Sequence, residues 1–186
     1  LATLAALPTP LTAIQLLWLN LLTDGAPALA LAMEKGDPDI MAQKPRPKNE
    51  SIVNRPMRVG IIVQTIAQTA AVLGAFLVGL SWHLDLQMPP GANPLLYLLE
   101  HNWRGVDVRT AQTMAFVTLS LCELFRAYTV RSERVSVFRL GVFSNKYMQY
   151  AVGASIVLLL LVIYVPFLQP VFNTHMMSVT EWALVL

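Results

Sequence analysis

Long uncharged stretches alternate with short charged ones along this chain. Residues 1–23, 59–84, 110–122 and 147–180 contain no Asp, Glu, Lys or Arg. An α-helix needs about 20 mostly apolar residues to cross a lipid bilayer. Three of the stretches have that length, and the third reaches it at residue 130 with only two charges added. The pattern therefore predicts four membrane-spanning helices.

Prolines mark the ends of the first and last predicted spans, because proline lacks the backbone N–H that continues a helix. Pro8 and Pro10 precede the first span, and Pro166 and Pro170 follow the fourth. The predicted fold class is all-α, a polytopic transmembrane helical bundle. Both ends of the chain look cut, and we expect a fragment of a longer membrane domain. The predicted spans are about 11–33, 59–82, 110–130 and 147–165, with a partial span at 181–186.

Composition excludes several other classes of protein. The 186 residues are 55% hydrophobic and only 13% charged, with a mean hydropathy of +0.55, whereas soluble domains carry about 25% charged residues. A water-soluble domain is therefore excluded, and the lipid bilayer is the expected partner. The lone Cys122 excludes an internal disulfide and a site built from several thiolates. The net charge of +2 is unevenly distributed, and we predict no nucleic-acid binding from it.

Basic residues set the predicted orientation, because short loops rich in Lys and Arg stay on the cytosolic side of a membrane. Residues 34–58 carry six of them and residues 126–146 carry five. The remaining two, Arg104 and Arg109, fall in the connection on the other side. Eleven of thirteen thus lie on one side, and we predict that the loops 34–58 and 131–146 are cytosolic.

The second predicted span carries two features that indicate contacts with other helices. Gln64 and Gln68 are spaced i, i+4, which is typical of side chains that hydrogen-bond between membrane helices. Small residues also recur every four positions, which permits the close approach of another helix. These small residues are Ala67, Ala71 and Ala75, with Gly74 beside them.

Asp24 is a charged residue near the middle of the first predicted span, and inserting it costs about 2.5–3.5 kcal/mol unless it finds partners. Asn20, Thr23 and Asp24 are spaced i, i+3, i+4 and share one helix face. Gly25 and Pro27 predict that the helix opens here and frees backbone carbonyls. Such oxygen donors suit Ca²⁺ or another hard cation. The alternative is an aspartate that caps the second half of a kinked helix.

Glu123 is a second acid near mid-membrane, in the third predicted span. The residues alone leave two interpretations open. Glu123 is an ion ligand, or it pairs with a basic side chain, either Arg126 at i+3 on its own helix or another basic residue that reaches into the span. We expect the carboxyls of Asp24 and Glu123 to be protonated when no ion is bound, because desolvation disfavours their charged forms.

Residues 14–31, IQLLWLNLLTDGAPALAL, strongly resemble the sixth transmembrane helix of type II P-type cation ATPases. Residues 37–41 and 44–47 resemble the cytosolic loop that follows that helix, and residues 113–124 resemble helix eight. The similarity is greatest to calcium pumps of the sarco/endoplasmic-reticulum type and their bacterial relatives. By this resemblance the chain covers helices six to nine, with the end of helix five before them and the start of helix ten after them.

The resemblance implies that Asn20, Thr23 and Asp24 are cation ligands, with Asp24 shared between the two ion sites of two-site pumps. Glu123 falls where those pumps have a ligand glutamate, which favours the ligand interpretation over the pairing one. Arg126 departs from their pattern and puts the number of ion sites in question. The loop that begins at Glu34, with Asp37 and Asp39, would contact the phosphorylation domain.

The resemblance further implies an ATP-driven cation pump, with Ca²⁺ as the transported ion and protons returning. We expect no catalytic residue in this chain, which lacks the Asp-Lys-Thr-Gly-Thr phosphorylation motif. MgATP would act only through domains outside it, and the expected partner is the N-terminal remainder of the pump. The alternatives are a Na⁺ or H⁺ pump, or a free-standing helical membrane subunit without ATPase activity.

Overall fold

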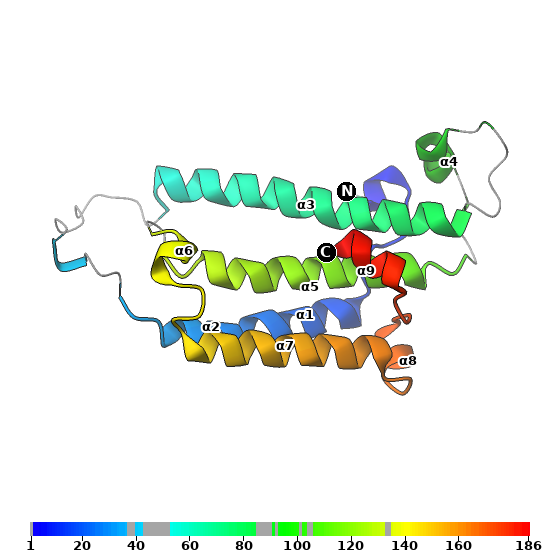
Figure 1. Cartoon of the computed structure of the whole chain (residues 1–186). Helices are drawn as coiled ribbons and strands as arrows, with labels where there is room; N and C mark the ends of the chain where they lie inside the picture. The colour runs from blue at the N-terminus through cyan, green and yellow to red at the C-terminus, as the bar shows by residue number, and fades with distance from the viewer. Residues whose placement is uncertain are drawn as a thin grey trace.

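The computed structural model describes residues 2–36, 40–42, 53–84, 91, 93–100, 102–103, 106–132 and 135–186. Every regular element within these ranges is helical, as predicted (Figure 1). The longer helices are α1 (Ala13–Asp24), α3 (Arg55–Leu84), α5 (Arg109–Thr129) and α7 (Lys146–Tyr164). The shorter elements are the 3₁₀ turns η1 (Thr3–Ala5) and η2 (Ile40–Ala42) and the helices α2 (Ala26–Ala32), α4 (Pro94–Glu100), α6 (Val137–Leu140), α8 (Gln169–Phe172) and α9 (Val179–Val185).

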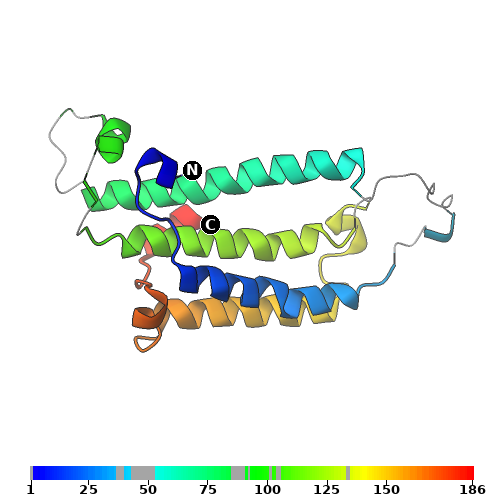
Figure 2. The same cartoon turned by 180° about the vertical axis from the view of Figure 1, so that it is seen from behind.

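The long helices lie side by side with their axes nearly parallel, as both opposite views show (Figures 1 and 2). Helix α3 packs along α5, and α5 in turn contacts α1, α2 and α7. The short C-terminal helix α9 lies against α5, and α8 contacts α7 and α1. The arrangement is a helical bundle with α5 at its centre.

Three helical segments within the described residues are long and apolar enough to cross a membrane: Ala13–Ala32, Met57–Trp82 and Lys146–Tyr164. They correspond to the first, second and fourth predicted spans. Together with the all-helical fold, they confirm the predicted class of helical transmembrane bundle.

Helix α5 occupies the place of the predicted span 110–130 but is not one of those three segments. The physical reason is its central position. Because neighbouring helices cover it, α5 can carry polar residues where an outer helix would meet lipid. Gln112, Thr113, Thr118 and Ser120 are all buried. The hydroxyls of Thr118 and Ser120 donate to backbone carbonyls one turn earlier, at 2.8 Å and 2.7 Å, which satisfies them within the helix.

The predicted opening of the first span is confirmed. Helix α1 ends at Asp24, Gly25 has a non-helical ψ of −93°, and α2 begins again at Ala26 with a proline in its first turn. A Cβ added to Gly25 would lie 2.8 Å from the carbonyl oxygen of Leu21, so the break depends on glycine. Close to it, the hydroxyl of Ser155 on α7 donates to the carbonyl of Leu22 at 3.0 Å, with both groups buried.

The close contact between α3 and α5 lies elsewhere than the small residues predicted. A Cβ added to Gly79 would lie 2.7 Å from the Cα of Ala111, so only glycine lets the two backbones approach there. By contrast, Ala67 and Ala71 are exposed, and a Cβ at Gly74 would meet no atom of the described chain within 4 Å. Of the three predicted alanines only Ala75 is buried, so the four-residue spacing marked the right helix and one residue of its packed face, but not the glycine of the closest approach.

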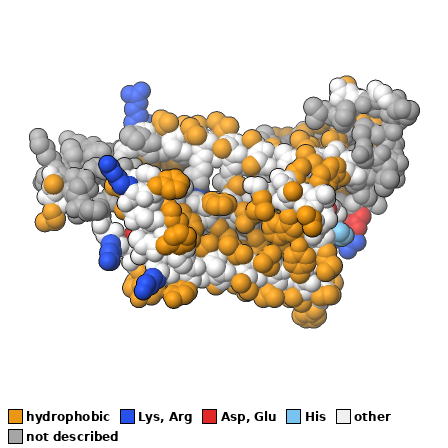
Figure 3. Space-filling view, viewed as in Figure 1, with side chains coloured by type: hydrophobic (Ala, Val, Ile, Leu, Met, Phe, Trp, Pro, Cys, Tyr) orange, Lys and Arg blue, Asp and Glu red, His pale blue; other side chains and the backbone are white. Residues whose placement is uncertain are grey.

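Charges gather at one end of the bundle. Figure 3 shows Lys and Arg side chains clustered at the end where Figure 1 places α6 and the start of α7, whereas hydrophobic side chains cover the middle. That end includes the described residues 34–36, 53–58, 131–132 and 135–146. The positive-inside rule, on which the prediction rests, assigns it to the cytosol.

Neutral amides tie the helices together at the opposite end. The side chain of Gln15 on α1 is fully buried, and its Nε2 donates to the carbonyls of Phe172 and Asn173 at 3.1 Å and 3.3 Å. Gln112 on α5 donates to the carbonyl of Thr9 at 2.9 Å and accepts from Asn173 Nδ2 at 2.8 Å. We call Gln15, Gln112 and Asn173 the amide network.

Candidate cation site

Helix α1 presents two of the predicted ligands just before the helix break. Asn20 is exposed and Thr23 is half-buried. The hydroxyl of Thr23 donates to the carbonyl of Leu19 at 2.9 Å, which leaves its oxygen lone pairs available to a cation. The backbone of Asp24 ends α1, whereas its side chain lies outside the described part of the chain. The predicted role of the Asp24 carboxylate therefore stays a prediction.

Glu123 faces α1 from the central helix α5. Its Oε1 accepts a hydrogen bond of 2.7 Å from Nε2 of Gln68 on α3. Its Oε2 lies 4.0 Å from Nη1 of Arg126, one turn later on α5. The contact with Gln68 is a short hydrogen bond, whereas the distance to Arg126 is too long for a hydrogen bond. The predicted alternative, pairing with Arg126, is thus present only as a long ion pair.

One cavity brings the predicted residues together across two helices. It measures about 190 Å³ and is lined by Leu16, Leu19, Asn20 and Thr23 of α1 and by Leu119 and Glu123 of α5. A neighbouring cavity of about 270 Å³ includes Thr23 and Glu123 again, together with Pro27 of α2 and Arg126 of α5. Three of the four predicted ligands, Asn20, Thr23 and Glu123, therefore line one cavity beside the break between α1 and α2.

These side chains offer an amide, a hydroxyl and a carboxylate oxygen. Such hard donors suit Ca²⁺ better than thiol- or imidazole-preferring metals. Among the described residues there is no group of three or more His, Cys, Asp and Glu side chains that could hold a metal ion. Since Ca²⁺ takes six to eight oxygens, the described side chains supply part of a coordination sphere.

Sequence reasoning missed the partnership between Gln68 and Glu123. The i, i+4 spacing of Gln64 and Gln68 did predict hydrogen bonds between helices, and Gln68 forms one. Its acceptor was not predictable, because 55 residues separate the two positions and no local pattern relates the rotation of α3 to that of α5.

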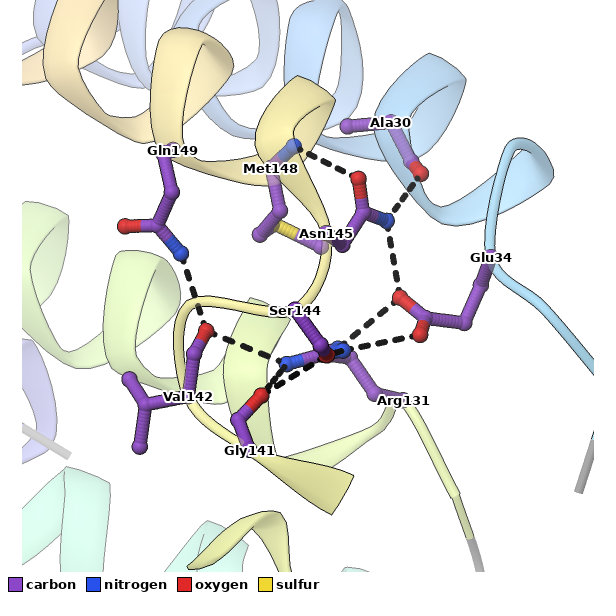
Figure 4. A network of polar contacts seen from close by, with 9 residues as sticks. All are labelled: Ala30, Glu34, Arg131, Gly141, Val142, Ser144, Asn145, Met148 and Gln149. Carbon is purple, nitrogen blue, oxygen red and sulfur yellow. Dashed lines mark hydrogen bonds and ion pairs between the residues drawn. The ribbon is translucent and has the colours of Figure 1, made fainter. Parts of the chain in front are cut away.

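A second polar centre lies at the cytosolic end of the bundle, and we call it the Arg131 network (Figure 4). The guanidinium of Arg131 has no exposed surface and donates two hydrogen bonds of 2.8 Å to the carboxylate of Glu34, just after α2. It also donates to Ser144 Oγ at 2.6 Å and to the carbonyl of Gly141 at 3.1 Å. The network thus holds the ends of α2 and α5 against the loop that leads to α7.

Asn145, which caps α7, completes the Arg131 network. Its Nδ2 donates to Glu34 Oε2 at 2.7 Å and to the carbonyl of Ala30 in α2 at 3.0 Å, while its Oδ1 accepts from the backbone of Met148. The hydrogen bonds from Arg131 hold the pKa of Glu34 below its ordinary value, although burial acts in the opposite direction. Glu34 in turn raises the pKa of Arg131. Asp37 and Asp39, in the same cytosolic loop, lie outside the described residues.

Known proteins are similar to this chain over nearly its whole length. Residues 8–186 match the family model described as "Cation transporting ATPase, C-terminus". The chain is 37% identical over 185 residues to the "Calcium-transporting ATPase" of Bacillus subtilis, covering 100% of this chain and 18% of that protein. It is 38% identical over 180 residues to "Calcium-transporting ATPase 1" of Yarrowia lipolytica, covering 97% and 17%.

A human relative shows the same relationship. "Calcium-transporting ATPase type 2C member 1" is 34% identical over 185 residues, with 97% of this chain and 17% of that protein covered. The chain thus spans less than a fifth of the length of these curated relatives. The match to the family model, the apolar helices and the bundle agree with one another: the chain belongs to the C-terminal membrane region of the cation-transporting P-type ATPases, and it is an integral, multi-pass membrane chain.

Proposed function

We propose that this chain is the C-terminal half of the transport domain of an ATP-driven Ca²⁺ pump that returns protons. The observation that carries the proposal is the single cavity lined by Asn20, Thr23 and Glu123 beside the break at Gly25. The relatives named above, which are calcium-transporting ATPases, support Ca²⁺ as the ion. The freed carbonyls of a broken membrane helix add further oxygen ligands.

In this proposal the chain contributes ion ligands and no catalytic chemistry. Asp24 joins Asn20, Thr23 and Glu123 as the fourth ligand side chain. The N-terminal remainder of the pump supplies further ligands, and its cytosolic domains use MgATP to phosphorylate an aspartate. In this proposal protons return as Ca²⁺ leaves, because a mid-membrane carboxylate such as that of Asp24 is costly to leave charged without a cation.

Substitution of the two acids in the full-length pump tests the ligand assignment. We expect Asp24→Asn and Glu123→Gln to remove or strongly weaken Ca²⁺-dependent phosphorylation by ATP, because each change removes a negative ligand but keeps the side-chain shape. Glu181→Gln is the matched control, since Glu181 is a buried acid that closes the capping box of α9. Normal phosphorylation with unchanged Ca²⁺ dependence in both site variants would overturn the assignment.

The transported ions need a separate measurement. In sealed vesicles containing the purified pump, we expect Ca²⁺ rather than Na⁺ to stimulate ATP hydrolysis, with protons moving opposite to Ca²⁺. Stimulation by Na⁺ alone, or activity that needs neither cation, would favour the Na⁺ or H⁺ alternative. The coding sequence upstream of Leu1 tests the free-standing alternative, since a pump requires the Asp-Lys-Thr-Gly-Thr motif there.

A further inference from the structure

The carboxylate of Glu123 lies between two groups that compete for it. Gln68 reaches it from α3 and donates a 2.7 Å hydrogen bond to Oε1. Arg126 approaches Oε2 from the same helix and stays at 4.0 Å. The side chain of Arg126 is 42% exposed and that of Glu123 28% exposed. Arg126 therefore has the conformational freedom to move closer, whereas Gln68 is half-buried on a packed helix.

A closer approach by Arg126 would harm a cation site. A hydrogen-bonded guanidinium neutralises the charge of a carboxylate. It also occupies the oxygen lone pairs in a bidentate geometry, so they are not available to a cation. A neutral amide from glutamine holds one oxygen and leaves the negative charge of the carboxylate in place. The two partners thus have opposite consequences for a cation that needs the charge of Glu123.

Gln68 lies just before the part of α3 that packs against α5. Val72, Phe76 and Leu80 of α3 are buried in one cluster with Ala111 and Ala115 of α5, and the close approach of Gly79 to Ala111 fixes the separation of the two helices there. Gln68 lies three helical turns before Gly79, and it also lines a cavity of about 340 Å³ with Thr65 and Thr69. The amide is therefore presented to Glu123 by a helix that has no residue in the cation cavity described above.

We propose that Gln68 is a positioning residue for the cation site. It holds Oε1 of Glu123 so that the carboxylate keeps its charge for the cation beside Asn20 and Thr23, and it prevents Arg126 from pairing with that carboxylate. The proposal rests on the proposed function, because it assumes that Glu123 is an ion ligand. Its effect is on ion affinity and not on the phosphorylation chemistry.

The test compares Gln68→Leu with Gln64→Leu in the full-length pump, measuring ATP hydrolysis against Ca²⁺ concentration. A hydrogen bond to a charged group contributes enough to change an affinity about tenfold when it is lost. We expect Gln68→Leu to raise the Ca²⁺ concentration for half-maximal activity about tenfold while the maximal rate stays near the unsubstituted value. Gln64→Leu makes the same change one turn away on α3, and we expect no shift.

Two double substitutions separate positioning from general damage to the fold. Adding Arg126→Gln to Gln68→Leu should restore much of the affinity, because the competing guanidinium is gone. In a pump that carries Glu123→Gln and keeps measurable Ca²⁺-dependent ATP hydrolysis at raised Ca²⁺, Gln68→Leu should produce no further shift. Equal shifts for Gln68→Leu and Gln64→Leu, no restoration by Arg126→Gln, or a full further shift in the Glu123→Gln background would each overturn the positioning role.

The same data distinguish failure of this proposal from failure of the proposed function. If Glu123→Gln itself leaves the Ca²⁺ dependence unchanged, Glu123 is not a ligand and the positioning role falls with it, and if Asp24→Asn is also without effect, the proposed site is wrong. If Glu123→Gln weakens Ca²⁺ activation but Gln68→Leu does not, only the positioning role is wrong. Should Gln68→Leu lower the maximal rate through poor folding, Gln68→Asn replaces it. This variant keeps the amide on a shorter side chain, and a shift near zero would overturn the proposal.

Discussion

The two ends of the bundle join the central helix α5 to its neighbours with different chemistry. At the cytosolic end, the Arg131 network joins α2, α5 and the start of α7 through a buried ion pair and the amide of Asn145. At the opposite end, the amide network joins α1 and α5 to α8 through neutral side chains only. Both ends satisfy backbone carbonyls that would otherwise be buried without donors.

The two ends also differ in how much stability is lost when one partner of the network is removed. A buried amide that loses its acceptor leaves unsatisfied neutral groups, which costs about 1–3 kcal/mol. A buried ion pair that loses one member leaves an uncompensated charge, which costs about 3–5 kcal/mol. The cytosolic end therefore loses more stability than the opposite end when one partner is removed. It is also the end whose stability depends on charge and pH.

The largest expected effect is that of Arg131→Met. The substitution leaves Glu34 charged with only Asn145 as a partner. It also removes the donors to the carbonyl of Gly141 and to Ser144 Oγ, although these two groups remain hydrogen-bonded to each other at 2.8 Å. We expect a loss of about 3–5 kcal/mol in the free energy of unfolding. The measurement is thermal unfolding of the full-length protein in detergent.

A paired substitution shows whether the uncompensated charge causes that loss. Replacing both partners, Arg131→Met with Glu34→Met, removes the charge as well as the hydrogen bonds. Buried ion pairs replaced by apolar residues often lose little stability, and we expect the double variant to be more stable than Arg131→Met alone. A double variant that is equally or more unstable would mean that the network acts through its hydrogen bonds to the loop 141–144.

A smaller effect is expected from Gln15→Leu at the opposite end. This change removes the donors to the carbonyls of Phe172 and Asn173 and the acceptor for the backbone N–H of Thr12. We expect a loss of about 1–3 kcal/mol in the free energy of unfolding, measured in the same way. Gln64→Leu on α3 serves as the control. A loss as large as that of Arg131→Met would erase the contrast between the ends.

Acid should weaken the cytosolic end selectively, with the smallest effect of the three. The folded-state pKa of Glu34 lies below its ordinary value of 4.5, chiefly because of the hydrogen bonds from Arg131. Its stabilising contribution is therefore fully present above about pH 4.5 and is lost as the pH falls through the lower folded-state pKa. We expect Glu34→Gln to reduce the fall in unfolding temperature below pH 4.5, whereas Gln15→Leu should leave that fall unchanged.

The contrast also shows what the sequence could predict. The break at Gly25 was predictable because its cause is local: Pro27 lacks a helix-forming N–H donor, and Gly25 adds backbone freedom, wherever the helix packs. The four long helices were predictable because the bilayer requires a length of apolar chain. The central position of α5 was not, since centrality depends on which helices pack around it.

The side-chain partnerships were predictable only as residue types. Gln68 was expected to hydrogen-bond between helices, but its acceptor Glu123 lies on another helix. Arg131 and Glu34 are 97 residues apart, and in the sequence each looks like an ordinary charged residue at the end of a span. Their pairing depends on the relative height of α2 and α5, which no local pattern encodes. The ligand role of Asp24 stays a prediction from the sequence and the family.

The break at Gly25 divides the first span into two short helices, α1 and α2, that meet in mid-bilayer. Helix α1 is held at its far end by the hydrogen bond from Gln15 to the carbonyl of Phe172. Near the break it is held by the hydrogen bond from Ser155 to the carbonyl of Leu22. Helix α2 is held at the cytosolic end by the hydrogen bond from Asn145 to the carbonyl of Ala30. Asn145 caps the start of α7 and Ser155 lies in its middle, so both α1 and α2 are bonded to α7, whereas α1 alone is also bonded to the end of α8. A displacement of α7 at the cytosolic end would therefore change the geometry of the oxygen ligands around an ion bound beside the break.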